Sequence, residues 1–247
     1  MIFSYSKLAT SVRQIFNSVG LEISRFDKCP RHTWLGLRHL PVRTVIDIGA
    51  NRGQFARSVL ALFPAARLYC FEPLSGAVDE LKRWAATQSP GQVNVFQVAL
   101  GEREGSVEMF LHTEHDTSSS LLRTTSTSES LYPFTSAQRT VSVNLTTLDA
   151  ACAGIRFEPD VLIKIDTQGY EKQVLLGGGA TLRRAQTCIL EINLFDLYES
   201  QASFSELISL LDEAGYRYAG NLEQVCDHKG QVIFIDAVFI RRPSGSV

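Results

Sequence analysis

A short apolar strand near residue 45 runs directly into a turn that combines an acid with two glycines, and this feature constrains the fold most. The turn has the spacing Asp-x-Gly-x-x-x-Gly and contains Asp47, Gly49, Asn51 and Gly53, and the next apolar segment ends on Glu72. Glycine lets the backbone approach a ligand closely, and an acid at the end of the second strand accepts hydrogen bonds from a ribose diol. The order therefore predicts an open α/β sheet that holds a nucleoside.

From residue 43 onward, apolar strand patterns alternate with helical patterns. Strands are expected at 44–48, 68–71, 93–98, 161–165 and 187–192, and helices at 54–62, 75–87, 170–176 and 204–214. Such alternation predicts a mostly parallel sheet with helices on both faces. A long final strand at 231–241 suggests that one antiparallel strand is inserted near the edge of the sheet.

Composition limits the classes of protein to which the chain can belong. Its 247 residues, 45% hydrophobic and 20% charged, suit a single globular α/β domain over 41–247. A net charge of −2 argues against a dedicated nucleic-acid binder, which would carry a basic surface. Five scattered cysteines favour a reducing compartment over a disulfide framework and form no zinc pattern. We expect a cytoplasmic protein, because we find neither a membrane-spanning apolar run nor a signal peptide.

The alternation of predicted strands and helices is interrupted between residues 106 and 145. Two strands with alternating polarity are expected at 106–111 and 140–145, and a polar stretch, 113–139, lies between them. A stretch of this length is usually functional or mobile. His115 within it is a candidate base for a hydroxyl nucleophile, although a solvated serine-rich loop is the more ordinary explanation.

The acidic turn distinguishes between two nucleoside cofactors. A dinucleotide site needs Gly-x-Gly-x-x-Gly, and a pyrophosphate would be repelled by a carboxylate such as Asp47. A cationic or zwitterionic group would be attracted instead, which favours S-adenosylmethionine with its ammonium and its positive sulfur over NAD. Ala99 and Leu100, just past the third strand, are expected to border the adenine ring.

A second polar constellation follows the strand at 161–165. Asp166 lies at its carboxyl end, where ligands of open α/β sheets bind. Lys164, two residues earlier in an apolar strand, needs a buried partner, and Glu191 on the next strand is the expected one. A structural ion pair and a role in the site are equally open for these two residues.

Residues 1–40 precede the nucleotide-binding pattern and form a predicted helical extension. Apolar residues recur in it at near-helical spacing from Ile2 to Val19. One interpretation is a helix that contacts a membrane or a lipid-bearing substrate. The more ordinary alternatives are a helix that caps the core or a dimer contact.

From about Arg43 to Arg241 the chain resembles the FkbM-type methyltransferases. The resemblance rests on the turn from Val45 to Gly53, on Phe71-Glu72-Pro73, on Ser118–Leu121 and Thr147-Leu148-Asp149, and above all on the string Ile163-Lys164-Ile165-Asp166-Thr167-Gln168-Gly169-Tyr170-Glu171 followed by Leu190-Glu191. It implies a Rossmann-like class I methyltransferase with a seven-stranded sheet. It further implies O-methylation, often of a sugar or polyketide hydroxyl.

The resemblance also implies roles for individual residues. Asp47, Gly49, Asn51, Gly53 and Glu72 would hold S-adenosylmethionine, and Asp166 would lie beside its reactive end. The amphipathic extension and the hydroxyl-rich loop are similar to those of sugar methyltransferases that act on bacterial glycolipids, so a small-molecule or glycolipid acceptor at the inner face of the membrane is expected.

The sequence leaves two alternatives for the catalytic residues. The base is Asp166 or His115 with support from Glu191, or else Asp166, Glu171 and Glu191 hold a divalent cation that lowers the pKa of the hydroxyl. Two other functions are weighed: an NAD(P)-dependent oxidoreductase, and a non-catalytic protein that keeps the cofactor pocket as a scaffold.

Overall fold

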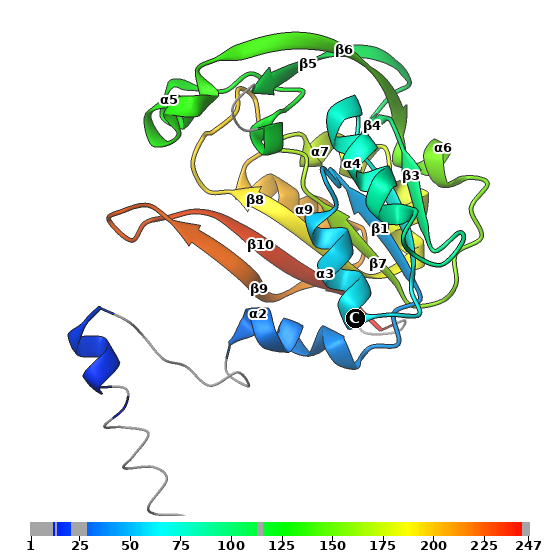
Figure 1. Ribbon diagram of the computed structural model, residues 1–247, viewed down its shortest axis with the longest axis horizontal. Helices are drawn as coiled ribbons and strands as arrows, with labels where there is room; N and C mark the ends of the chain where they lie inside the picture. Colours follow the sequence, from blue (N-terminus) through cyan, green and yellow to red (C-terminus); the bar gives the residue numbers. More distant parts are fainter. Residues whose placement is uncertain (1–11, 13, 21–28, 113–115, 244–247) are drawn as a thin grey trace, which may run out of the picture.

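The centre of the molecule is a seven-stranded sheet. The computed structural model describes residues 12, 14–20, 29–112 and 116–243 (Figure 1). The sheet has the order β3-β2-β1-β7-β8-β10-β9 and consists of β1 (Thr44–Ile48), β2 (Arg67–Phe71), β3 (Val93–Phe96), β7 (Val161–Ile165), β8 (Ala185–Asn193), β9 (Tyr216–Cys226) and β10 (Val232–Arg241). Its first five strands are parallel, and β10 is antiparallel to both neighbours. The predicted sheet, with an antiparallel strand near its edge, is confirmed.

Helices cover both faces of this sheet, as predicted (Figure 1). One face packs on α3 (Gln54–Leu62), on α4 (Ser75–Ala85) and on the 3-10 segment η2 (Trp34–His39). The other face packs on α6 (Leu148–Cys152), α7 (Glu171–Leu176), α8 (Gly179–Arg184) and α9 (Phe204–Glu213). Strand residues such as Ile46 and Ile163 are fully buried on this second face because a parallel sheet covered on both sides exposes neither.

A separate three-stranded sheet, β4-β6-β5, lies beside the carboxyl ends of the main strands (Figure 1). It consists of β4 (Ala99–Gly101), β5 (Gly105–His112) and β6 (Gln138–Thr147), so the two predicted strands in this region are confirmed. The stretch between β5 and β6 has more structure than its sequence suggests, with η3 (Asp116–Ser118), α5 (Ser126–Leu131) and η4 (Pro133–Thr135). The hydroxyl of Thr125 caps α5 by accepting a hydrogen bond from the Ser128 amide at 3.2 Å, a local signal for a helix start.

The predicted extension, 1–40, is described only in part, and its division from 41–247 remains a prediction. Residues 12 and 14–18 are helical. A short helix, α2 (Pro30–Thr33), precedes η2, in which Leu37 is buried in the main core. Among the described residues, no helix is long and apolar enough to cross a bilayer.

Asp149 performs a structural task in joining α6 to α8. Its two carboxylate oxygens accept hydrogen bonds from the backbone amides of Ala180 and Thr181, at 2.8 and 2.7 Å. These amides belong to the first turn of α8, where backbone donors have no partner within the helix. The Thr-Leu-Asp string of the family resemblance therefore secures a helix.

We predict that Asp149→Ala lowers the free energy of unfolding by about 1–2 kcal/mol, because it leaves the first turn of α8 without acceptors. Chemical denaturation monitored by circular dichroism measures the change. Asp79→Ala, an exposed acid on α4, serves as the control and should change stability by less than about 0.5 kcal/mol. Equal effects of the two substitutions would contradict the capping role.

Candidate functional site

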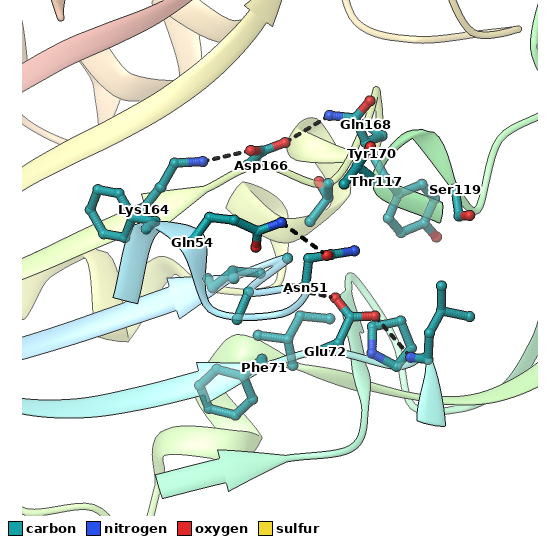
Figure 2. A pocket seen from close by; sticks show the side chains of 18 of the residues that line it. Asn51, Gln54, Phe71, Glu72, Thr117, Ser119, Lys164, Asp166, Gln168 and Tyr170 are labelled. Carbon is teal, nitrogen blue, oxygen red and sulfur yellow. Dashed lines mark hydrogen bonds and ion pairs between the residues drawn. The ribbon is translucent and has the colours of Figure 1, made fainter. Parts of the chain in front are cut away.

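A cavity of about 550 Å³ opens at the carboxyl ends of β1, β2 and β7 (Figure 2). From β1 the chain proceeds to β2 and β3 on one side, whereas β7 and β8 lie on the other. Such a point of reversal is where open α/β sheets bind ligands. The cavity therefore lies where the sequence pattern predicts a nucleoside site.

The turn after β1 is shaped by two glycines with different neighbours. Gly49 has φ +79°, and a Cβ there would lie 1.8 Å from the carbonyl oxygen of Asp166, so the end of β1 can pass β7 only without a side chain. Gly53 has φ +86°, and a Cβ there would lie 2.6 Å from the Leu81 side chain of α4. Gly49 and Asn51 line the cavity, whereas Gly53 is not among its lining residues.

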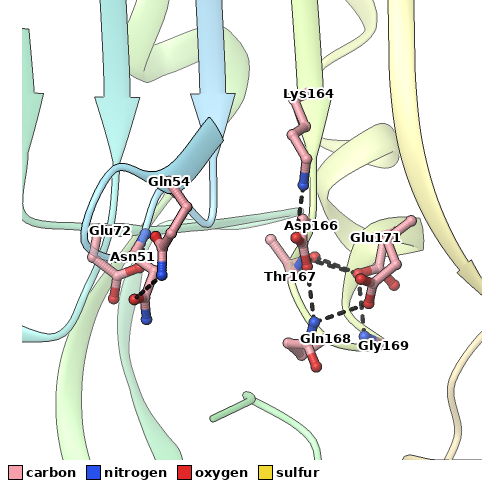
Figure 3. Close-up of polar contacts among 10 residues, drawn as sticks. Asn51, Gln54, Glu72, Lys164, Asp166, Thr167, Gln168, Gly169 and Glu171 are labelled. Atoms are coloured by element: carbon pink, nitrogen blue, oxygen red, sulfur yellow. Dashed lines mark hydrogen bonds and ion pairs between the residues drawn. The ribbon is translucent and has the colours of Figure 1, made fainter. Parts of the chain in front are cut away.

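Glu72 holds the same turn from the end of β2. Its side chain is buried, and its oxygens accept hydrogen bonds from the backbone amides of Asn51 and Leu74, both at 2.9 Å. Figure 3 shows Glu72 next to Asn51, whose Oδ1 accepts in turn from the Gln54 side chain at 3.2 Å. An acid thus stands at the cavity wall, as the sequence predicts.

The wall next to Glu72 is apolar. Ala99 and Leu100 of β4 are buried and line the cavity together with Phe71 and Leu74. A flat aromatic ligand would be desolvated favourably against these side chains. Ala99 and Leu100 thus line the cavity, and their contact with an adenine ring stays a prediction.

Lys164 pairs with Asp166, which corrects the sequence-based expectation. Its ammonium Nζ lies 2.6 Å from Asp166 Oδ2, and the Lys164 side chain is only 9% exposed. Glu191 was the expected partner because it lies on the adjacent strand. Asp166 is the partner instead because it lies two residues after Lys164 in the same segment, and alternate residues of an extended segment point to the same face.

Gln168 connects Asp166 and Glu191 instead, and Figures 2 and 3 show its contact with Asp166. Its Nε2 donates to Asp166 Oδ1 and to Glu191 Oε1, both at 2.8 Å, and its Oε1 accepts from the Tyr198 hydroxyl at 2.6 Å. Gln168 also has φ +56°, a left-handed backbone conformation that is uncommon outside glycine. The amide therefore has a fixed orientation between the two carboxylates.

Charge is unevenly distributed around Lys164. Burial favours its neutral amine, but the attraction of Asp166, Asp236, Asp47 and Glu191 outweighs this effect and raises the pKa of Lys164. Burial raises the pKa of Asp47 to about 7, against the attraction of Lys164. Burial, reinforced by the charge of Asp166, raises the pKa of Glu191 well above its ordinary value. Four acidic side chains thus surround one cation.

Asp47 is itself buried and lies opposite Lys164 in the β1–β7 register. Its Oδ2 has no hydrogen-bond partner among the described residues. Asp47 is not a lining residue of the cavity. It lies on β1, two residues before Gly49 of the turn.

Glu171 does not join the other acids in a ligand set. Its Oε1 accepts hydrogen bonds from the Thr167 amide, the Thr167 hydroxyl and the Gly169 amide, at 2.8, 3.1 and 3.1 Å (Figure 3). Burial raises the pKa of Glu171 to about 7 in spite of these bonds. Within the described ranges, no group of three or more His, Cys, Asp or Glu side chains is arranged to hold a metal ion.

The candidate base His115 lies outside the described residues. Its neighbour His112 is buried at the end of β5 and is not among the lining residues of the cavity. Ser119 and Thr117, from the same region, do line it. The hydroxyl-rich segment therefore reaches the site through these residues.

Sequence reasoning missed two groups of residues at this site. Gln168 and Tyr198 were given no role, and only the position of Gln168 inside the motif string could have drawn attention to it. Trp34 and Phe55 line the cavity from η2 and α3, and their rings lie 6.0 Å apart. Nothing in the sequence pattern indicates that these two segments meet.

Comparison with known proteins identifies the family. The profile of the family described as "Methyltransferase FkbM domain" matches residues 47–218. The chain is also 31% identical, over 184 residues, to 2-O-methyltransferase NoeI of Sinorhizobium fredii, with 72% of this chain and 74% of that protein covered.

Solved structures resemble the chain at lower identity. A methyltransferase FkbM from Methylobacillus flagellatus KT has a TM-score of 0.48 and 13% identity, over 81% of this chain and 44% of that one. Magnesium protoporphyrin IX methyltransferase from Synechocystis has a TM-score of 0.48 and 13% identity, over 94% of this chain and 96% of that one.

The residues of the cavity fit the cofactor of this family. S-adenosylmethionine combines an aromatic base, a ribose diol, an ammonium and a positive sulfur. The cavity offers an apolar wall at Ala99 and Leu100, an acid at Glu72 and further acidic side chains at Asp166 and Asp236. The chain belongs to the FkbM methyltransferase family and is an S-adenosylmethionine-dependent methyltransferase.

Proposed function

We propose that the enzyme transfers the methyl group of S-adenosylmethionine to a hydroxyl oxygen of a sugar carried on a glycolipid or another glycosylated metabolite. The similarity to a 2-O-methyltransferase supports oxygen as the methylated atom. The observation that carries the proposal is a second cavity, of about 390 Å³, that shares Asp166, Gln168 and Thr117 with the first. Donor and acceptor can thus occupy neighbouring cavities that meet at Asp166.

In this proposal the first cavity binds the donor. Glu72 lines the cavity with its oxygens positioned by the backbone amides of Asn51 and Leu74, and its carboxyl group is the acceptor for the ribose diol. At Gly49 and Asn51 the backbone of the turn approaches the cofactor closely. Gly53 and Asp47 do not line the cavity and act by supporting the turn. Ala99 and Leu100 contact the base. When bound, the cofactor supplies an electrophilic methyl group on a positive sulfur.

Glu191 serves as the base for the acceptor hydroxyl. Asp166 is less available to the acceptor, because its oxygens already contact the ammonium of Lys164 at 2.6 Å and the Gln168 amide at 2.8 Å. The hydrogen bond that Glu191 accepts comes from the neutral Gln168 amide, and Glu191 lines the second cavity. As the acceptor oxygen bonds to the methyl carbon and the bond from that carbon to sulfur breaks, Glu191 takes the hydroxyl proton. Asp166 positions Gln168 by accepting a hydrogen bond from its amide.

We predict that Glu191→Gln lowers turnover by about 100-fold or more while the affinity for S-adenosylhomocysteine changes by less than about threefold. Release of S-adenosylhomocysteine, with glycosides and extracted glycolipids as acceptors, measures turnover, and calorimetry measures affinity. Glu213→Gln, an exposed acid on α9, is the matched control. Normal turnover by Glu191→Gln together with an inactive Asp166→Asn would assign the base to Asp166.

The pH profile tests the same assignment. A base must be ionised to accept a proton, and the raised pKa of Glu191 means that it remains protonated above the usual glutamate range. The wild-type turnover should therefore rise with pH through a midpoint well above about 4.3. A profile that is flat from pH 5 upward would show that Glu191 is not the base.

Family membership disfavours the NAD(P)-dependent oxidoreductase. Family membership likewise disfavours a non-catalytic protein that keeps the cofactor pocket as a scaffold.

The glycolipid part of the proposal is supported by the described part of the N-terminal extension. Ile15 and Val19 are 65% and 68% exposed, and Val12 and Phe16 add further exposed apolar surface. Lys7, Arg13 and Ile2, which belong to the predicted amphipathic pattern, lie outside the described residues. An apolar face of this kind suits peripheral contact with a membrane that carries the acceptor.

We predict that the wild-type protein sediments with phosphatidylcholine–phosphatidylglycerol vesicles and that the double substitution Ile15→Ser/Val19→Ser lowers the bound fraction at least threefold. The expected reason is the loss of buried apolar area at the lipid interface. Gln14→Ser, an exposed polar substitution in the same segment, should bind like the wild type. Unchanged binding of the double variant would rule out this contact.

A further inference from the structure

The second cavity has a wall of aromatic side chains contributed by separate segments. Tyr132 and Phe134 come from the region of α5 and η4, Tyr198 follows β8, and Phe234 lies on β10. Its volume of about 390 Å³ falls within the range of small-molecule sites. Figure 1 shows the segment with α5 placed over the end of β8, which is how such distant residues come to share one cavity.

Polar groups stand among these rings. The Asn193 side chain lines the cavity and is only slightly exposed, and it makes no hydrogen bond with any described residue. Ser128 and Thr135 contribute hydroxyls, and Glu191 contributes its carboxyl group. A carboxamide can both donate and accept, which suits recognition of a ligand hydroxyl.

The charge of this cavity limits the class of its ligand. Its described lining residues include two acids, Asp166 and Glu191, and no Lys, Arg or His. A phosphate, a nucleotide or a carboxylate would find no cation among these residues to pair with. Apolar faces with scattered hydroxyl partners suit an uncharged polyhydroxylated ring, whose carbon-bound hydrogens pack on aromatic rings.

We propose that this cavity is the acceptor subsite and that it binds an uncharged pyranose ring, one face of which packs on Tyr132 and Phe234 while a hydroxyl pairs with Asn193. The inference deepens the proposed function and rests on it. A ring seated here would present its edge to Gln168, which is shared by both cavities and held by Tyr198.

The test measures sugar binding directly, in the presence of S-adenosylhomocysteine. Saturation-transfer NMR and calorimetry with a panel of methyl glycopyranosides should detect binding by the wild type. Tyr132→Leu and Phe234→Leu keep an apolar side chain but remove the ring, so each should weaken sugar binding about 3- to 10-fold. Asn193→Leu should weaken it about 10-fold or more. None should change the affinity for S-adenosylhomocysteine more than about twofold.

Tyr218→Leu is the matched control, because Tyr218 is a 45% exposed ring on β9 that does not line either cavity. A methyl glycuronide, which adds one carboxylate to the probe, should bind at least tenfold more weakly than its neutral counterpart. Equal or tighter binding of the glycuronide, or no binding of any glycopyranoside, would overturn the proposal.

The two proposals can fail separately. If the glycosides bind and the variants weaken them but no glycoside or glycolipid is methylated, the subsite stands and the proposed reaction falls. If a sugar acceptor is methylated and the three substitutions leave its KM unchanged, the reaction stands and the acceptor binds elsewhere.

Discussion

The buried ion pair between Lys164 and Asp166 is the interaction on which the rest of the site depends. Removing an ammonium from water costs several kcal/mol, and a lysine in a central strand is tolerated only when excellent partners offset that cost. Asp166 at 2.6 Å supplies the direct contact, and Asp47 on the neighbouring strand adds attraction. The pairing has a consequence for Glu191, which must share the neutral amide of Gln168. One amide therefore holds two carboxyl groups in fixed positions, and only Asp166 of the two is in direct contact with Lys164.

The motif after β7 acts mainly as a scaffold for this arrangement. Glu171 accepts three hydrogen bonds from Thr167 and Gly169, which fixes the loop from within. Gly169 has φ +94°, and a Cβ there would lie 2.8 Å from the Tyr198 ring, so glycine is needed for that ring to reach Gln168. The most specific string in the sequence thus holds functional groups in position, and only some of its residues face the cavities.

The parts that the sequence predicts well are governed by local rules. The bounds expected for β1, α3 and β7 agree with the structure because apolar periodicity and the glycine turn determine them. By contrast, β9 was not assigned a range, since its residues are mostly half-buried or exposed and show no regular alternation. The prediction that Lys164 pairs with Glu191 was wrong for a similar reason. The adjacency of two strands does not determine which side chain a flexible lysine contacts.

The two cavities differ in how far they can be predicted from the sequence, because one is built by local geometry and the other by long-range packing. The walls that the donor cavity presents at Gly49 and Glu72 come from one strand–turn–helix–strand unit, so their positions are set by short-range geometry and can be inferred from spacing. The aromatic cavity joins residues of α5, β8, β9 and β10 that lie far apart in the sequence, such as Ser128 and Phe234, and long-range packing alone brings them together. Changes in those segments would alter the aromatic wall without disturbing the turn at Gly49. Donor chemistry is therefore readable from a sequence of this kind, whereas acceptor chemistry has to be read from the assembled cavity.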